Sequence, residues 1–501
     1  MRENRTVRFD PARLFAPARG ASGWPRLPAM LGEAAVATSH PLATRAGLRA
    51  LEKGGNAVDA ALAAAAMLTV CEPGHNGPGG DLFAVLWWDG GLVGLNGSGR
   101  SPAELEARVV DEAGPRSVTV PGAVAGWADL AARFGRLGLD AALAPAIDAA
   151  ERGTVATPRV AEHWRLAAGR APWPVPEIGE RYVLPGLAET LRRIAAEGRD
   201  GYYLGPVAES IAAASWLAEA DLAAHGSEWV EPLRLAYRGL EVCELPPNGQ
   251  GAAVLIALAL SDGLDLGLHG EIEAMKLALA DAYGHIADAP LPAFLLDPVH
   301  LAERRALIRA DRALAAQPSR EGGTTYLCCV DGDRNAISLI QSTYDHFGSG
   351  VLAAGTGVVL QNRGACFSAE PGHPNELAPA KRPFHTIIPG LLLEGGRLLG
   401  PFGVMGGSMQ AQGHFQLVRA LAEGADPQGA LDAARFRVTG GRKVELEPGL
   451  WAEAEALRAA GHEPVLSPHP HGFGVGQVIL TLGDSLVAGS DGRGDGHAAG
   501  L

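Results

Sequence analysis

Cysteine is scarce in this sequence, and its spacing matches no common metal or disulfide framework. The chain has five cysteines, which are Cys71, Cys243, Cys328, Cys329 and Cys366. An odd number without paired spacing excludes a disulfide-rich secreted scaffold. Side chains of adjacent residues on a strand point to opposite faces, so Cys328 and Cys329 cannot chelate one ion together. A reducing, cytoplasmic location is therefore expected.

Long apolar runs and clusters of positive charge are also missing. The longest apolar stretch, 57–71, contains Asp59 and is too short to cross a bilayer. Residues 1–27 carry charges without a continuous apolar segment, so they do not resemble a secretory signal. With 42 Lys and Arg against 56 Asp and Glu, the formal charge is −14. An acidic surface repels phosphate backbones, and neither nucleic acid nor a membrane is expected as a partner.

Glycine and proline are abundant, with 67 and 35 residues spread over the 501-residue chain, which indicates many tight turns. Residues 1–32 have no clear period and are expected to form a loosely ordered leader. Regular patterns then predict a strand over 35–39, a helix over 42–53 and an alanine-rich, buried helix from residue 57. Helical patterns dominate from about 122 to 310. After residue 323 the pattern changes to strands separated by Asx and Gly turns.

Residues 324–342 have the pattern of a β-hairpin. Two strand-like runs, 324–330 and 336–342, flank five turn residues. A turn symmetric about Asp333 sets Thr324 opposite Ser342, with Cβ atoms about 4.5–5.5 Å apart. Two opposed hydroxyls at a strand end are more often a plain cross-strand pair than a catalytic one, so the hairpin alone does not decide the matter.

The residues before Thr324 favour a chemical role for it. Gly322 and Gly323 allow the preceding peptide to take a strained conformation. Cleavage there gives Thr324 a free α-amino group with an ordinary pKa of about 7.7–8.0, so part of it is neutral at pH 7. A threonine hydroxyl is a weak nucleophile without a base, and this amine supplies one within the same residue.

The hairpin and six further blocks carry a resemblance to a known family. The segment TTYLCCVDGDRNAISLIQSTYDHFGSG at 324–350 resembles the start of the small subunit of γ-glutamyltransferases. The other blocks are VATSHPLATRAGLRALEKGGNAVDAAL (36–62), EPGHNGPGGDLF (72–83), VPGAVAGW (120–127), ELPPNGQG (244–251), GVMGGS (403–408) and GSDGRGDGHAAG (489–500). The resemblance covers about residues 33–498, with the blocks in the family's order.

This resemblance implies an α+β fold, the four-layer αββα sandwich of N-terminal-nucleophile hydrolases. It implies self-cleavage into a large chain, 33–323 after the leader, and a small chain, 324–501, which together form one domain. Thr324 matches the nucleophile and Ser342 the hydroxyl that supports it. Gly406 and Gly407 match the pair whose N–H groups line the oxyanion hole, although a Gly-Gly pair in isolation is usually a plain turn.

No cofactor or metal is implied by the resemblance. Two histidines around a proline, His469 and His471, are more typical of an ordinary loop than of a metal site. The expected partners are a small-molecule amide and the two chains of one precursor, which pair with each other. Assembly into a higher oligomer is also compatible with the family.

The positions expected to bind a γ-glutamyl group differ from the family pattern. Cys366 stands where an amine-binding aspartate is expected, and Arg363 replaces a neutral amide. His385 and Thr386 replace a serine pair, and Tyr344 replaces an asparagine. These five residues are the candidate substrate-binding positions within the small chain.

The arginine expected to bind the substrate carboxylate is also displaced. Its position by motif is Ser98, whereas Arg100 lies two residues later. Arg100 is therefore a sixth candidate for substrate binding, provided that its loop turns toward the pocket.

The substitutions favour an anionic substrate without an α-amine, because a carboxylate is lost at Cys366 and a guanidinium is gained at Arg363. Within the family, LNGSGRSP, LQNRGACFS and KRPFHTIIPG most resemble the oxamate amidohydrolase branch. The sequence thus predicts hydrolysis of a small acid amide such as oxamate through an acyl-enzyme on Thr324. Two alternatives stay open: a γ-glutamyltransferase or glutathione hydrolase, and a non-catalytic binding protein of the same fold. Arg363 in a structural ion pair is a third, more local alternative.

Overall fold

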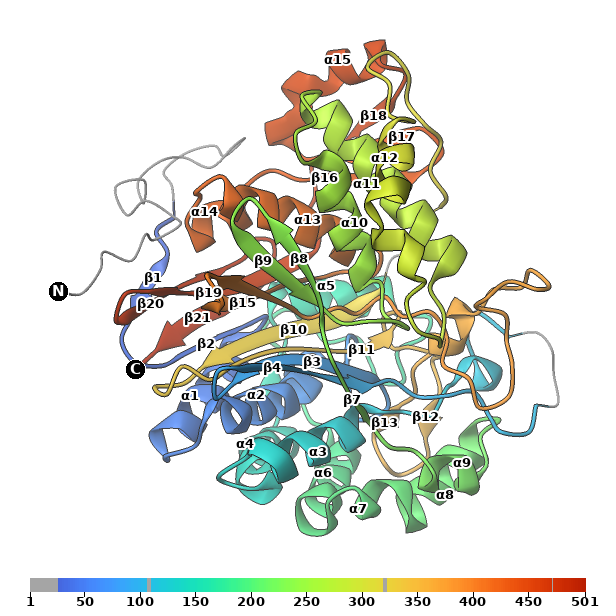
Figure 1. Cartoon of the computed structure of the whole chain (residues 1–501). Coiled ribbons are helices and arrows are strands. Elements are labelled where there is room, and N and C mark those ends of the chain that lie inside the picture. Colours follow the sequence, from blue (N-terminus) through green and yellow to red (C-terminus); the bar gives the residue numbers. More distant parts are fainter. Residues whose placement is uncertain (1–25, 106–109, 319–321, 471) are drawn as a thin grey trace.

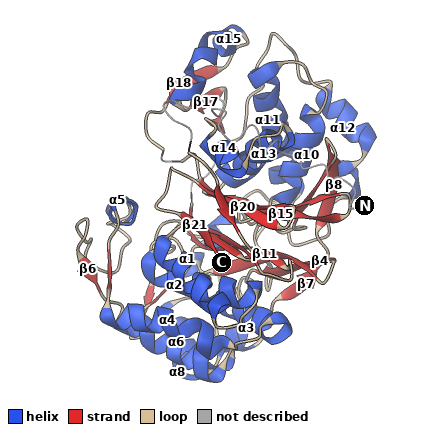
Figure 2. Ribbon diagram, turned by 90° about the vertical axis from the view of Figure 1, so that its left-hand side faces the viewer, coloured by secondary structure: helices blue, strands red, loops and turns tan. Residues whose placement is uncertain are grey.

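Two seven-stranded sheets lie face to face in the centre of the protein, and helices cover the outer face of each (Figure 1). The computed structural model describes residues 26–105, 110–318, 322–470 and 472–501. Figure 2 shows the same four layers from the side. Among the described residues no helix is both long and apolar enough to cross a membrane. The predicted αββα sandwich is confirmed.

Both sheets combine strands from each side of residue 324. The first has the order β21 (His497–Gly500), β2 (Ala35–Thr38), β10 (Gly323–Val330), β11 (Ala336–Tyr344), β3 (Asp81–Trp88), β4 (Gly91–Gly97), β7 (Glu228–Val230). The second has the order β1 (Ala29–Leu31), β20 (Ser485–Ser490), β19 (Val475–Leu482), β15 (Arg397–Met405), β14 (Gly390–Glu394), β9 (Leu240–Glu244), β8 (Leu233–Tyr237). The segments before and after the predicted cleavage site therefore fold as one body.

Each helical layer comes mainly from one part of the chain (Figure 1). The first sheet is covered by α1 (Pro41–Glu52), α2 (Ala57–Cys71), α3 (Ala123–Phe134), α4 (Leu139–Arg152), α6 (Pro185–Glu197), α7 (Asp200–Tyr203), α8 (Gly205–Ala214) and α9 (Glu219–Ala223). The second is covered by α10 (Gly251–Ser261), α11 (Gly267–His285), α12 (Pro298–Arg305), α13 (Met409–Ala422) and α14 (Pro427–Asp432).

Smaller elements extend from these layers. A three-stranded sheet of β16 (Phe436–Gly440), β17 (Lys443–Leu446) and β18 (Glu463–Leu466) lies with α15 (Ala454–Ala459) beyond the second helical layer. The strands β5 (Thr154–Val155) and β6 (Arg181–Tyr182) pair with each other and flank α5 (Pro158–Leu166), and β12 (Leu352–Ala353) pairs with β13 (Val358–Val359). Short 3-10 helices occupy Pro115–Ser117, Ala293–Leu296, Arg363–Cys366 and Pro448–Glu453.

Three apolar cores separate the four layers, and alternation along the strands assigns residues to them. Tyr326 and Cys328 lie in the core between the two sheets, whereas Leu327 and Cys329 lie in the core beneath α2. The two adjacent cysteines thus face opposite sides of the sheet, as predicted, and all five cysteines are free.

The start of α2 joins the hairpin to the helical layer. Asn56 and Asp59 form a capping box, and the N–H of Ala57 donates to Asp331 Oδ2 at 3.0 Å. Asp331 also accepts from the N–H groups of Asp333 and Asn335 within its own turn. This carboxylate therefore fixes the turn of the hairpin against the helix beneath it.

Short strands occur at two places where the sequence pattern did not predict them. Ala29–Leu31, within the expected loose leader, pairs with β20 as an edge strand; residues 1–25 lie outside the described residues. Strands β8 and β9 lie within the stretch expected to be mainly helical. They turn at Arg238 and Gly239, whose φ angles of 48° and 79° allow a tight hairpin. Their alternation is short and was hidden by neighbouring helical patterns.

Candidate active site

Thr324 and Ser342 lie at the end of the β10–β11 hairpin, in the centre of the sandwich. From Thr325↔Gln341 to Val330↔Ala336 the register is the one predicted from a turn centred on Asp333. A bulge between Gly323 and Thr325 then shifts the register, and Gly323 pairs with Tyr344. The hydroxyls of Thr324 and Ser342 are 3.2 Å apart and both residues are buried. The predicted juxtaposition is therefore present despite the bulge.

The Ser342 hydroxyl is the centre of a directed set of hydrogen bonds. It donates to the carbonyl oxygen of Gly323 at 2.5 Å, because a carbonyl oxygen only accepts. It accepts from the Thr324 hydroxyl and, at 2.8 Å, from the Tyr344 N–H. One continuous line of hydrogen bonds thus runs from Thr324 Oγ1 through Ser342 Oγ to the carbonyl of the Gly323–Thr324 bond.

Arg363 brings a buried positive charge to this hydroxyl. Arg363 is the first residue of a 3-10 helix and is fully buried. Nη2 lies 3.4 Å from Ser342 Oγ, and Nη1 donates to Thr386 Oγ1 at 2.9 Å. The guanidinium carbon is 4.4 Å from the centre of the Tyr344 ring, a cation–π distance. Tyr344 itself holds a φ of 76°, so the backbone bends sharply here.

The charge of Arg363 has no counter-ion within the described part of the chain. The thiol of Cys366 lies 3.8 Å from Nη1. Nε has no hydrogen-bond partner among the described residues. The structural ion pair considered for Arg363 is not found there. A buried guanidinium without a carboxylate is costly, and it favours an anion from outside the chain.

His385 lies on the other side of this guanidinium and is held by Asp81. Nε2 of His385 is 3.0 Å from Asp81 Oδ2, and both side chains are inaccessible to solvent. Burial, and next the charge of Arg363, lower the pKa of His385 to about 4, although the hydrogen bond that His385 donates to Asp81 acts in the opposite direction. His385 is therefore neutral at pH 7, and it adds no second positive charge to the pocket.

Asp81 is a site residue whose role the sequence did not indicate. Asp81 is the first residue of β3 and pairs directly with Ser342 on the neighbouring strand β11. Oδ1 accepts from the N–H groups of Gly99 and Gly122 and from Gln361 Nε2, at 2.9–3.1 Å. With its oxygens engaged in this way, Asp81 fixes three loops around the hairpin end.

Gly406 and Gly407 lie between β15 and the start of α13, close to the predicted cleavage site. Their φ angles, 129° and 61°, favour glycine. A Cβ on Gly322 would lie 3.4 Å from the Cα of Gly407, so the pair adjoins the residue before Gly323. Both glycines precede Ser408, the N-cap of α13, and the oxyanion role of their N–H groups stays a prediction from the resemblance.

Two glutamines that sequence analysis missed support this arrangement. Gln410, in the first turn of α13, donates from Nε2 to Thr324 Oγ1 at 3.4 Å and accepts from the Ile388 N–H. Gln250 donates to the carbonyls of Thr386 and Gly407. Both glutamines lie within conspicuous motifs, GGSMQ and PPNGQG, but nothing in their spacing indicates that they meet.

The two glycines before Thr324 are closely surrounded by other atoms. A Cβ on Gly322 would lie 2.9 Å from the carbonyl oxygen of Tyr344, and one on Gly323 would lie 3.1 Å from Nδ1 of His346. The peptide ahead of Thr324 therefore needs glycine for steric reasons, which supports the importance of the Gly322-Gly323 pair noted in the sequence.

Arg100 is not brought to this cluster. Its guanidinium, about a third exposed, pairs with Asp288 at 2.7 Å and with Glu228 at 3.0 Å. Ser98, the position expected by motif, is buried and hydrogen-bonded to Asn96. Carboxylates far away in the sequence thus hold Arg100 at the edge of the protein, which sequence spacing did not predict.

The side chains around Thr324 do not form a metal-ligand set. Over the described ranges, three His, Cys, Asp or Glu ligand atoms come within 4.8 Å of one another only at His269, Glu273 and His462, away from this site. His471 of the His-Pro-His segment lies outside the described residues.

Known proteins with similar sequences and structures span nearly the whole chain. The family model for Gamma-glutamyltranspeptidase matches residues 43–501. Glutathione hydrolase-like YwrD proenzyme of Bacillus subtilis (strain 168) is 34% identical over 93% of this chain and 98% of its own. Oxamate amidohydrolase proenzyme of Klebsiella pneumoniae is 35% identical over 92% of this chain and 97% of its own. The crystal structure of cephalosporin acylase from Bacillus halodurans matches with a TM-score of 0.90 and 41% identity, over 96% and 98% of the two chains.

Proposed function

The chain belongs to the gamma-glutamyltranspeptidase family and is an enzyme, and from that premise we propose that it is a self-processing amidohydrolase with Thr324 as its nucleophile. Two of the relatives above are named as proenzymes, which supports processing from a precursor. The large chain, 33–323, and the small chain, 324–501, would then stay paired in one domain. The cytoplasmic location inferred from the cysteines stays a prediction.

The hydrogen bonds around Ser342 support a specific first step for self-cleavage. Thr324 Oγ1 attacks the carbonyl carbon of Gly323 and passes its proton to Ser342 Oγ, while Ser342 passes its own proton to the carbonyl oxygen. The tetrahedral intermediate is then neutral, which suits a buried site. Breaking the C–N bond transfers a proton to the Thr324 nitrogen and leaves an ester, which water hydrolyses to free the amine.

The mature enzyme would use the same atoms on an external amide. The free α-amine of Thr324 accepts the proton of its own hydroxyl as Oγ1 attacks the substrate carbonyl, and returns it to the leaving nitrogen. The N–H groups of Gly406 and Gly407 would stabilise the oxyanion, and Ser342 would orient the nucleophile. Water then releases the acid from the acyl-enzyme.

One observation carries the proposed substrate class: the buried guanidinium of Arg363 has no carboxylate partner within the described chain and lies 3.4 Å from Ser342 Oγ. A carboxylate on the acyl side of the substrate would supply the missing charge through a two-pronged contact. The site then suits a small acid amide such as oxamate, and one relative is named an oxamate amidohydrolase.

Two other substrate classes are favoured by particular relatives. A γ-glutamyl compound is suggested by the glutathione hydrolase-like relative, but its ammonium group needs a carboxylate partner. Cys366 holds no charge of that kind, and Asp81 is already engaged by His385 and Gln361. A larger acyl group on a cephalosporin is suggested by the structural neighbour at 41% identity.

A hydrolysis assay with matched amides tests this choice. Oxamate should be turned over much faster than propionamide, which is similar in size but lacks the carboxylate. Glutathione, a γ-glutamyl anilide and an acylated cephalosporin complete the set. If wild-type enzyme prefers glutathione over oxamate, the proposed substrate class is wrong while the Thr324 chemistry stands. A wild-type chain that stays uncut yet is fully active would contradict the mechanism itself.

A further inference from the structure

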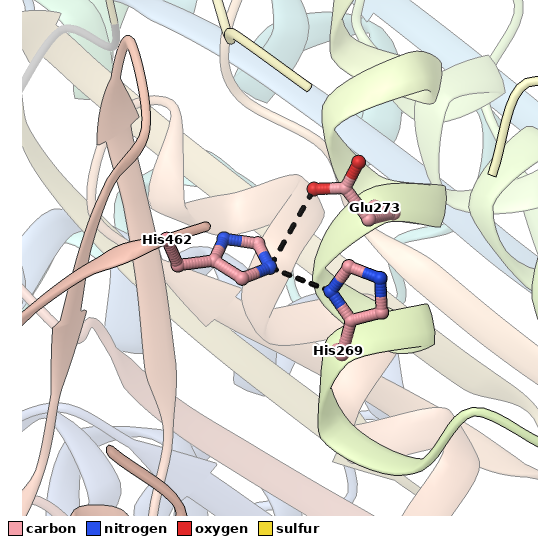
Figure 3. Close-up of side chains that lie close together, drawn as sticks. All are labelled: His269, Glu273 and His462. Atoms are coloured by element: carbon pink, nitrogen blue, oxygen red, sulfur yellow. Dashed lines mark hydrogen bonds and ion pairs between the residues drawn. The ribbon is translucent and has the colours of Figure 1, made fainter. Parts of the chain in front are cut away.

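A second cluster of buried, chemically active side chains lies far from Thr324, between α11 and the segment that precedes β18. His269 and Glu273 lie one turn apart on α11, and His462 approaches them from the other side (Figure 3). Their exposed fractions are 9%, 0% and 4%. All three ligand-type atoms lie within 4.8 Å of one another. The amidohydrolase chemistry uses none of these residues.

The hydrogen bonds of the cluster have a defined direction. The carbonyl of Arg309 only accepts, so Nε2 of His269, 2.8 Å away, carries a hydrogen. With a neutral ring, Nδ1 of His269 is then bare, and it accepts from Nε2 of His462 at 2.7 Å. Nδ1 of His462 in turn accepts from Lys276 Nζ at 3.2 Å. A single hydrogen therefore lies between two ring nitrogens that both face Glu273.

The carboxylate of Glu273 has one backbone donor and one charged partner. Oε2 accepts from the N–H of Leu314 at 2.8 Å. Oε1 forms an ion pair with Lys276 Nζ at 2.9 Å and lies 3.7 Å from His462 Nε2. Oε1 is thus held by the ammonium of Lys276 and has an imidazole nitrogen 3.7 Å away, so a cation that displaces this ammonium would meet a carboxylate and two imidazoles.

We propose that His269 Nδ1, His462 Nε2 and Glu273 Oε1 form a binding site for a divalent transition metal of the zinc class. Two imidazoles and a carboxylate are ligands that zinc, cobalt and nickel accept, whereas magnesium and calcium prefer oxygen alone. The other ring nitrogen of His269 already donates to a backbone carbonyl, which is the usual outer contact of a metal-binding histidine. The ion takes the place of the hydrogen on His462 Nε2, which leaves to solvent as a proton, and Lys276 passes a proton to His462 Nδ1 so that the bound imidazole stays neutral.

Binding requires a small expansion of the cluster. Zinc–nitrogen bonds of about 2.0–2.1 Å place two tetrahedral ligands about 3.3 Å apart, whereas the rings are in hydrogen-bond contact here. The ammonium of Lys276, which also donates to the Leu314 carbonyl at 2.8 Å, repels an incoming cation. Lys276 is therefore a competitor for the same negative charge, and removing its charge should favour the metal.

The ligands come from both sides of residue 324, so a bound metal would connect these two parts of the chain. His269 and Glu273 precede residue 324, and His462 follows it. Arg309 and Leu314, which the cluster holds by backbone contacts, belong to the segment that leads to Gly323. If the chain is cut as proposed, the ion would join the large and small chains. This last consequence rests on the proposed self-cleavage; the metal site itself does not.

Metal binding to the wild-type protein is the first test. Protein freed of metals with a chelator is titrated with zinc by calorimetry and with cobalt by visible absorption. One ion per chain, a ligand-field spectrum of a nitrogen- and oxygen-bound cobalt and a higher Tm with zinc are expected. Crystals soaked in zinc should give an anomalous peak between the three side chains. Zinc found only at surface positions, or no stoichiometric binding, would overturn the proposal whatever the enzyme's activity.

Conservative variants then locate the ligands. His269→Asn, His462→Gln and Glu273→Gln should each weaken zinc binding at least about 10- to 100-fold, the range seen when outer contacts alone are lost. His285→Asn, at the exposed end of the same helix, should bind as the wild type does. Lys276→Met should bind zinc more tightly. Unchanged affinity in the ligand variants, or weaker binding in Lys276→Met, would show that the ligand set is wrong.

Discussion

The hydroxyl of Ser342 lies 2.5 Å from the carbonyl oxygen of Gly323 and donates its hydrogen to it, although the two residues are nineteen positions apart. The bulge in β10 produces this contact, because it pairs Gly323 with Tyr344 and turns the carbonyl toward Ser342. The bond that is predicted to break is thus polarised by the same hydroxyl that accepts the hydrogen of Thr324.

Thr324 should be required for cleavage of the Gly323–Thr324 bond. Thr324→Ala is expected to remain one chain, because no hydroxyl is left to attack the carbonyl. Thr324→Ser keeps the hydroxyl and should still be cut. Intact mass and N-terminal sequencing after storage without protease measure the cleavage of both variants. Efficient cutting of Thr324→Ala at the same bond would mean that another group is the nucleophile.

Ser342→Ala should fold but lose most of its self-cleavage and turnover. Removing one positioned donor from such a site costs about 10²–10³ in rate. Ser342→Thr retains the hydroxyl and should recover a large part of both activities. The single-turnover cleavage rate and the kcat of any mature fraction are the quantities to compare. Full activity in Ser342→Ala would show that the relay does not pass through this residue.

Arg363→Gln should raise the KM for an acid amide by about ten- to a hundredfold, since a charge-assisted contact contributes about 1.5–3 kcal/mol. The KM for propionamide should change little, because this control lacks the carboxylate. Arg363→Lys keeps the charge but not the two-pronged geometry, so an intermediate KM is expected. Equal effects on both amides would point to a general loss of structure.

Gly322→Ala should slow self-cleavage without harming the mature enzyme. The added Cβ would lie 2.9 Å from the Tyr344 carbonyl oxygen, so the peptide before Thr324 must shift. Once cut, the residue is no longer joined to Thr324, and kcat per processed enzyme should match the wild type. Gly332→Ala, in an open turn where the nearest atom is 4.0 Å away, is the control and should be cut normally.

Acidification from pH 7 to pH 5 should destabilise the protein partly through His385. Burial and Arg363 lower the pKa of His385 to about 4, below its ordinary value of about 6.5. Between these values the unfolded chain binds the proton and the folded chain does not, so stability rises with pH across this window and is lost as the pH falls. The histidine contributes about 1–2 kcal/mol between pH 5 and pH 7.

Urea unfolding at both pH values measures this effect. His385→Gln can still donate to Asp81 but cannot be charged, so its loss of stability between pH 7 and pH 5 should be smaller than that of the wild type. His285→Gln, an exposed position, should behave as the wild type does. Burial also raises the pKa of Glu72 to about 8, which acts in the opposite direction, so only the difference between variants is diagnostic.

Much of the hairpin and of the helix beneath it could be predicted because the signals are local. Alternation fixed which residues of β10 face each core, and a five-residue turn around Asp333 fixed the register up to Thr325. The bulge was not predicted, since a single extra residue leaves the alternation pattern almost unchanged. The edge strands β1 and β8 were missed because short strands depend on the partner that they pair with.

The sequence by itself determined the family and the hairpin, and it carries the prediction that Thr324 is the nucleophile, because these depend on neighbouring residues and on motifs in a fixed order. Only the tertiary structure decided which distant side chains meet. Arg363 lies beside Ser342 with no carboxylate partner among the described residues, Arg100 is held by Asp288 and Glu228, and His462 contacts His269. Such contacts arise from the packing of separate layers, and the energy of a buried charge depends on what the fold places next to it.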